Sequence, residues 1–130
     1  MDTPTRDSEK PAIIFKPSTF TLHTFHGQVN NRRIVFQVIK MKTSTFVCVN
    51  YEDEFHFSNL SLVLNSNNKP IGTQLVGNLS EYDTETMAMG LCKKLKKNVY
   101  LSCNLDNDRF TLPVVLKQLI NEINTFPEKF

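Results

Sequence analysis

Hydrophobic and polar residues alternate along the first half of the chain, which is the pattern of β-strands. Five segments have it: residues 20–29, 32–41, 44–51, 60–65 and 71–77. Asn30-Asn31 lies between the first two, and asparagine tolerates the positive φ angles of a tight turn. Only Lys42 and Thr43 separate the second strand from the third, which predicts another hairpin. We therefore expect these strands to form an antiparallel meander.

The hydrophobic period then changes to that of an α-helix. In residues 81–98 the apolar positions share one helix face: Met87, Ala88, Leu91, Cys92 and Leu95. Acidic residues precede this face and lysines follow it, as the helix dipole favours, and Asn98 is a candidate for the helix end. NVYLSCNL (98–105) predicts a sixth strand. A second helix, with Pro113 in its first turn, carries one apolar stripe: Leu112, Val115, Leu116, Leu119, Ile120, Ile123 and Phe126.

These elements predict an α+β fold, with a six-stranded antiparallel sheet and two helices on one of its faces. Residues 1–18 carry three prolines among charged residues and read as a flexible tail. Residues 19–130 are expected to form a single domain.

The central strands are apolar on both faces, which the two helices alone do not explain. Ile34, Phe36 and Val38 alternate with Val35, Gln37 and Ile39. Two helices of about 15 residues cover one face of such a sheet, so the other face needs a further layer. That layer is either a partner protein, packed sheet to sheet, or this chain's own tail or first strand folded across the face. The candidate partner-binding residues are Val35, Gln37, Ile39, Val47, Val49, Tyr100 and Ser102.

Composition narrows the function classes. Fifteen basic and 13 acidic residues give a net charge of +2, too balanced to indicate nucleic-acid binding. No apolar run of about 18 residues predicts a membrane span, and the N-terminal residues lack the apolar core of a secretory signal. Three cysteines without a CxxC pair indicate reduced thiols in an intracellular protein.

Candidate chemistry is sparse. His23 and His26 have H-x-x-H spacing, but a strand places them on opposite faces, so no metal site is predicted. Cys48, Cys92 and Cys103 lie in apolar segments, where cysteine is usually inert. The acidic residues 52–54 read as a solvated loop, and the lysines of residues 93–97 as a helix end. We predict no catalytic, cofactor-binding or metal-binding residue.

The end of the given sequence, NTFPEKF, is unusual in carrying an aromatic residue just past a helix stop. Pro127 ends the helix, and residues 127–130 reach only about 12 Å. We expect Phe130 to fold back onto the edge of the core as an anchor, with Glu128 and Lys129 in solvent. The alternative is a recognition tag held by another protein.

Residues 70–130 resemble the proteasome assembly chaperone 4 family. The resemblance lies in a strand that ends in Val76-Gly77, where the family has Leu-Gly, in Gly90-Leu91 near the middle of a helix, in a strand that ends in Asn104-Leu105 and in the Phe126–Phe130 ending. Residues 20–65 agree with the family in strand pattern only, and residues 1–18 do not match.

The resemblance implies a non-catalytic chaperone that acts as a heterodimer, sheet to sheet, with the related assembly chaperone 3. The pair would bind alpha-type proteasome subunits, chiefly the fifth, while the alpha ring forms. A cytoplasmic location is implied, with the nucleus also open. Two other classes stay as alternatives: an adaptor that binds peptides at a sheet edge as a stable monomer, and a small cysteine-dependent enzyme with a reactive thiol.

Overall fold

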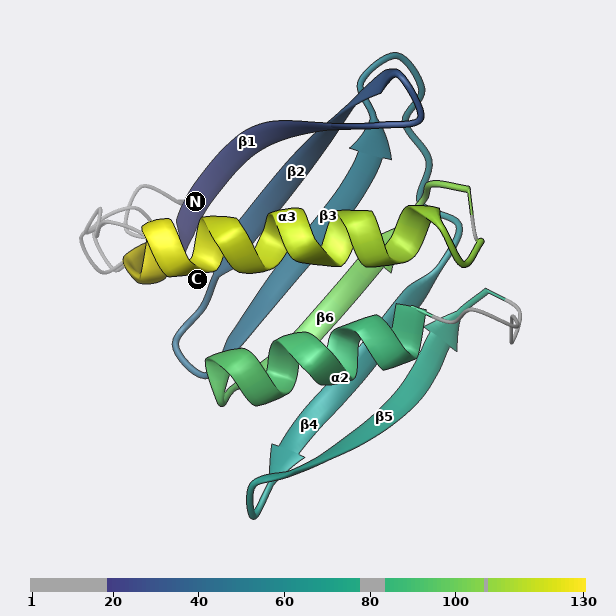
Figure 1. Ribbon diagram of the computed structural model, residues 1–130. Helices are drawn as coiled ribbons and strands as arrows, with labels where there is room; N and C mark the ends of the chain where they lie inside the picture. The colour runs from purple at the N-terminus through teal and green to yellow at the C-terminus, as the bar shows by residue number, and fades with distance from the viewer. Residues whose placement is uncertain (1–18, 78–83, 107) are drawn as a thin grey trace, which may run out of the picture.

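The computed structural model describes residues 19–77, 84–106 and 108–130, which form one sheet with two helices packed on it (Figure 1). The predicted tail 1–18 lies outside the described residues. The elements run in the order β1 (Thr21–Val29), β2 (Arg32–Lys40), β3 (Ser44–Tyr51), β4 (Leu60–Ser66), β5 (Lys69–Val76), α2 (Thr84–Leu95), β6 (Asn98–Cys103), α3 (Thr111–Thr125) and the 3₁₀ turn η1 (Pro127–Lys129). No helix within the described residues is long and apolar enough to cross a membrane.

The sheet is mixed rather than wholly antiparallel, because β6 inserts between β3 and β4. The strand order is β1-β2-β3-β6-β4-β5, and β6 runs parallel to β3 and antiparallel to β4. The predicted five-strand meander is therefore wrong between β3 and β4, which are not neighbours, whereas β4 and β5 form the expected antiparallel hairpin. Short turns fix the directions of the hairpins, whereas β6 arrives after a helix and is free to enter the sheet next to a strand that is distant in sequence.

Two of the hairpin turns follow from paired asparagines. Asn30 and Asn31 have φ angles of 52° and 60°, which confirms the predicted turn, and Asn67 and Asn68 repeat the arrangement with 51° and 64°. Two consecutive positive φ angles match the right-handed twist of the flanking strands. The end of α2 differs from expectation, since Lys96 (φ 57°) leaves the helix and Asn98 already belongs to β6.

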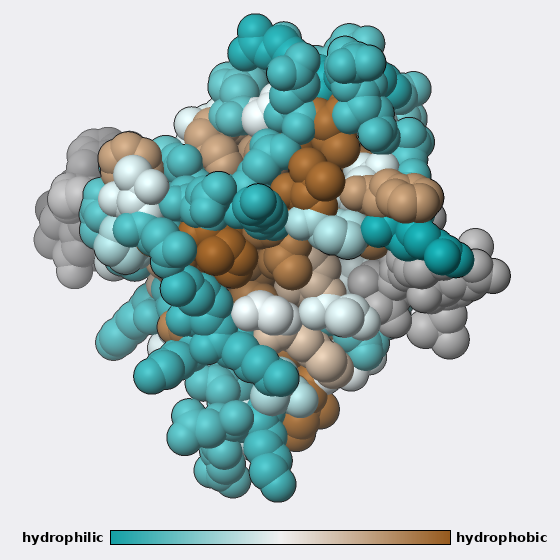
Figure 2. Space-filling view, in the orientation of Figure 1, coloured by the Kyte–Doolittle hydropathy of each residue, from teal (hydrophilic) through white to brown (hydrophobic). Residues whose placement is uncertain are grey.

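Both helices lie on one face of the sheet, as predicted, and enclose the core (Figure 1). The sheet contributes one side chain in two from each central strand, chiefly Ile34, Phe36, Val38, Val47, Val49, Val63, Val99 and Leu101. The helices contribute Met87, Ala88, Leu91 and Cys92 from α2 and Leu112, Val115, Leu119 and Ile123 from α3. Seen from this side, polar side chains cover most of the surface and apolar ones show between them (Figure 2).

Phe130, not Phe126, completes the core at the end of α3. Phe126 was predicted on the buried stripe but is 42% exposed, whereas Phe130 is 2% exposed. The turn η1 reverses the chain, so that the Phe130 ring meets Phe25 edge-on at 6.3 Å between centroids. The predicted anchor position is therefore confirmed.

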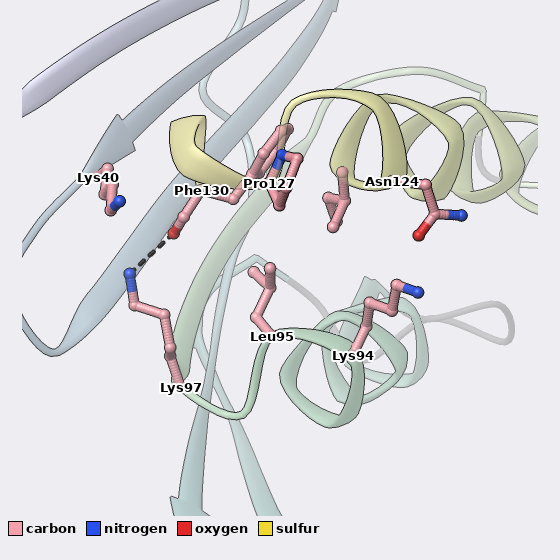
Figure 3. A pocket seen from close by; sticks show the side chains of 8 residues that line it. Lys40, Lys94, Leu95, Lys97, Asn124, Pro127 and Phe130 are labelled. Carbon is pink, nitrogen blue, oxygen red and sulfur yellow. Dashed lines mark hydrogen bonds between the residues drawn. The ribbon is translucent and has the colours of Figure 1, made fainter.

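Three side chains tie this ending to the sheet and to the loop before β6. Lys40 Nζ donates to the main-chain oxygen of Glu128 at 2.8 Å. Thr45 Oγ1 and Lys97 Nζ donate to the main-chain oxygen of Phe130 at 2.7 and 2.8 Å. Figure 3 shows Phe130 at the wall of a pocket of about 510 Å³ between the ends of the two helices.

Candidate protein-binding face

The face of the sheet opposite the helices carries a row of apolar side chains across five strands. Residues paired across neighbouring strands point to the same face. Following these pairs from β1 to β4 gives Leu22, Ile39, Phe46, Tyr100 and Leu62, which we call the apolar row. Leu64 and Ile71, a pair between β4 and β5, lie beside its end.

The apolar row is accessible and long enough for a protein partner. Leu22 at one end is 73% exposed, and Ile71, beside the other end, is 57% exposed. The other members, Ile39, Phe46, Tyr100 and Leu62, are half-buried within this chain. Five strands about 4.8 Å apart make the row roughly 19 Å long. A continuous apolar surface of this kind marks an interaction site more often than a solvated face.

Two of the predicted partner-binding residues lie on the wrong face. Val47 pairs with Val38, and Val49 with Phe36, and all four belong to the core beneath the helices. Both valines are fully buried. The prediction that they share a face with Val35 is therefore incorrect.

The register of the hairpin gives the physical reason. In this hairpin Lys40 pairs with Thr45, so each odd-numbered residue of β2 stands opposite an even-numbered residue of β3. The companions of Gln37 and Ile39 are therefore Cys48 and Phe46. A turn of two residues at 42–43 places residue 41 opposite residue 44, and therefore Ile39 opposite Phe46. The register, and with it Phe46 as a residue of this face, could thus have been predicted from the sequence.

Val35 and Ser102 are on the predicted face but are not accessible. Val35 is 6% exposed and Ser102 is fully buried. Ile39 and Tyr100 are half-buried in the apolar row, and Gln37 is exposed beside it. The structure therefore brings three of the seven predicted residues together at an accessible surface.

The connection between β3 and β4, residues 52–59, covers the part of the face where Val35 and Ser102 lie. The main-chain N–H of His56 donates to Asn50 Oδ1 at 2.8 Å, and that of Ser58 to Asn104 Oδ1 at 2.9 Å. Asn104 Nδ2 in turn donates to Ser102 Oγ at 3.0 Å. These polar side chains are hydrogen-bonded to one another and to the loop, which lies over them. We call this part of the face, with Val35, Asn50, Ser102 and Asn104, the covered end.

The three thiols have surroundings that disfavour catalysis. Burial raises the pKa of Cys103 to about 12 and raises the pKa of Cys48 and of Cys92. The side chain of Cys48 contacts the amides of Asn50 and Asn104, and neither amide is a proton acceptor that could activate a thiol.

This environment predicts slow thiol alkylation of the folded chain. At pH 7 to 8 a raised pKa keeps nearly all of each thiol protonated, and the thiolate is the reactive form. We expect all three cysteines to react at least tenfold more slowly with iodoacetamide in the native protein than in urea. Rapid stoichiometric labelling of Cys48 at pH 7 would revive the cysteine-enzyme alternative.

The histidines of the H-x-x-H pattern lie apart, on opposite faces. His23 Nε2 lies 2.8 Å from a carboxylate oxygen of Glu122 on the helix side, and His26 Nε2 lies 3.6 Å from Glu52. Within the described ranges no group of three or more His, Cys, Asp or Glu side chains is arranged to hold a metal ion.

Comparison with known proteins gives concordant results. Residues 33–105 match the family model described as proteasome assembly chaperone 4. The curated proteasome assembly chaperone 4 of Mus musculus is 33% identical over 114 residues, covering 85% of this chain and 90% of that protein. Its Homo sapiens counterpart is 29% identical over the same shares. The matched residues 33–105 include strands β2 to β4, where the motif resemblance was weakest.

A solved structure shares the fold. It is described as a novel chaperone complex for yeast 20S proteasome assembly, and one of its chains superposes with a TM-score of 0.65 at 11% identity. The superposition covers 83% of this chain and 98% of that one. The likeness therefore concerns the arrangement of the sheet and its helices.

Proposed function

Because this chain belongs to the proteasome assembly chaperone 4 family, we propose that it is a non-catalytic chaperone for assembly of the proteasome core particle. It acts as a heterodimer with an assembly chaperone 3-like protein. The heterodimer binds alpha-type subunits, chiefly the fifth, during formation of the alpha ring.

The apolar row is the observation that carries this proposal. Two sheets that pack face to face lie about 10 Å apart, and their inner side chains interdigitate. A partner with a similar sheet would place its own row over Ile39, Phe46 and Tyr100. The yeast chain that shares this fold comes from a complex described as a chaperone complex, which is consistent with such pairing.

The chemistry of the same surface supports a non-catalytic role. The accessible side chains of the apolar row are hydrocarbon or phenol groups, and the thiols are protonated at neutral pH. We also propose a cytoplasmic location, extending to the nucleus, which the unpaired cysteines of the described chain suit.

Phe46→Asp tests the proposal. The carboxylate would stand in the middle of the sheet-to-sheet contact without a partner, which costs several kcal/mol in an interface. We expect at least a hundredfold weaker binding of the assembly chaperone 3-like partner, measured by calorimetry or by co-purification of co-expressed chains. The free monomer keeps its melting temperature within a few degrees, because Phe46 is half-exposed there.

The matched control is Phe110→Asp. Phe110 is 76% exposed at the start of α3, on the helix side of the sheet. This variant should bind the partner like the wild type. If Phe46→Asp also binds normally, the apolar row is not the contact surface, and the sheet-edge adaptor becomes the better account.

A further inference from the structure

The loop that links β3 to β4, residues 52–59, displays two phenylalanines in solvent. Phe55 is 61% exposed and Phe57 is 53% exposed, and only His56 separates them. A phenylalanine gains stability from burial, and in the described part of the chain more than half of each of these side chains stays in solvent. Aromatic residues in such positions are enriched at protein interfaces.

Hydrogen bonds hold the loop at the residue between these two phenylalanines and at the two residues that follow them. His56 N–H donates to Asn50, and Ser58 donates to Asn104 through both its N–H and its Oγ. Asn59 exchanges two hydrogen bonds with the main chain of Cys103, of 2.6 and 3.0 Å. The main chain next to the two phenylalanines therefore has little conformational freedom left to lose, which lowers the entropic cost of binding through their rings.

Ion pairs hold the first part of the loop. The Arg32 guanidinium stacks on the Tyr51 ring at 3.6 Å and lies 2.9 Å from Asp53 and 3.7 Å from Glu54. Its hydrogen bond lowers the pKa of Asp53. The acidic residues of this loop therefore tether it to β2 and do not form a free acid–base pair.

The position of the loop relates it to the apolar row. Asn50 and Asn104 project from the face opposite the helices, and the loop main chain rests on their side-chain oxygens. The loop thus rises above the sheet as a wall at the covered end. Asn50 is four residues along β3 from Phe46, which is about 13 Å. A sheet packed on the apolar row at a spacing of about 10 Å would meet this wall.

We infer that Phe55 and Phe57 are anchors that contact an apolar patch at the edge of the partner's sheet and fix where that sheet sits on the apolar row. The occupant is the same sheet-bearing partner chaperone, so the inference rests on the proposed function. The wall and the row form one stepped surface. A related chaperone with polar residues at the sheet edge that meets the loop would lose these contacts. The loop therefore also contributes to the choice of partner.

The test compares Phe55→Ser/Phe57→Ser with the wild type and with Phe46→Asp, using the purified assembly chaperone 3-like partner. The double variant keeps every side chain whose hydrogen bonds or ion pairs hold the loop on the sheet. A thermal melt checks that each variant is folded. Phe110→Ser removes a ring that is still more exposed, at 76%, from the helix side and is the matched control. We expect the loop double variant to bind the partner at least tenfold more weakly and Phe110→Ser to bind unchanged.

The binding results for these variants distinguish the inference about the loop from the proposed function. If Phe46→Asp loses the partner and the loop double variant retains wild-type affinity, the inference is overturned while the proposed function stands. The inference is equally overturned if the double variant forms a normal heterodimer but fails to bind the alpha-type subunit, since the loop then faces the client. If the wild type does not bind the partner at all, the proposed function itself fails.

Discussion

Val47→Asp is expected to unfold the isolated chain, although its neighbour Phe46→Asp leaves the chain folded. Val47 is fully buried between Val38 of β2 and Leu101 of β6, under the helices. The described residues place no lysine, arginine or histidine in the buried core to pair with a carboxylate there. An unpaired buried charge costs several kcal/mol. Domains of this size are stable by only about 5–15 kcal/mol, so one such charge consumes much of the total.

Circular dichroism of the purified monomers would measure the difference. We expect Val47→Asp to be insoluble or to lack a cooperative melt above 25 °C, and Phe46→Asp to melt near the wild type. The two positions are adjacent in sequence and equal in secondary structure, so strand propensity cannot account for the contrast. A stable, cooperatively folded Val47→Asp would mean that Val47 faces away from the helices.

That contrast also shows where sequence reasoning succeeds on this fold and where it fails. Alternation correctly divided β2 and β3 into two faces each, because the side-chain period of a strand is two residues. Alternation within one strand does not say which of its faces matches a face of the next strand. Only the register does so, and the register was available from the short turn at 42–43.

The placement of β6 was harder to predict. Its apolar pattern identified a strand, but the pattern is equally compatible with an edge and with the centre of a sheet. β6 lies between β3 and β4, where Val99 and Leu101 are fully buried in the core, and this burial is a property of the assembled fold. Local sequence signals carry little information about such long-range pairing.

The covered end was missed for a related reason. Ser102 alternates correctly with Leu101, so sequence placed it on the accessible face. Its burial depends on Asn104 and on a loop more than 40 residues earlier in the chain. The asparagines at 50, 59 and 104 gave a possible signal, since buried amides are usually held by loop main chain.

Phe130 is the second position where a large effect is expected. Phe130→Ala removes a ring that is 2% exposed and that packs edge-on against His23 and Phe25. Replacing a buried Phe by Ala typically costs about 3–5 kcal/mol. For a domain of this length each kcal/mol lowers the melting temperature by about 4 °C, so a fall of 10 °C or more is expected.

Deletion of residues 127–130 extends the test from the ring to the whole ending. The deletion also removes the main-chain oxygens that accept from Lys40, Thr45 and Lys97, and it leaves Thr45 buried without that acceptor. An unsatisfied buried hydroxyl adds about 1–3 kcal/mol to the loss. The deletion should therefore destabilise more than Phe130→Ala, while Lys129→Ala, a half-buried neighbour, should change little.

Partner binding distinguishes the anchor from a recognition tag. The ending lies on the helix side, close to the ends of α2 and α3 (Figure 3). The apolar row lies on the opposite face of the sheet. Affinity for the assembly chaperone 3-like partner, measured below the melting transition and per folded molecule, should therefore be unchanged by Phe130→Ala. If the melting temperature stays the same and binding of the partner or of the alpha-type subunit is lost, Phe130 is a contact residue and the buried position seen here is not its functional one. Phe126, which is 42% exposed, would then be the second residue to replace.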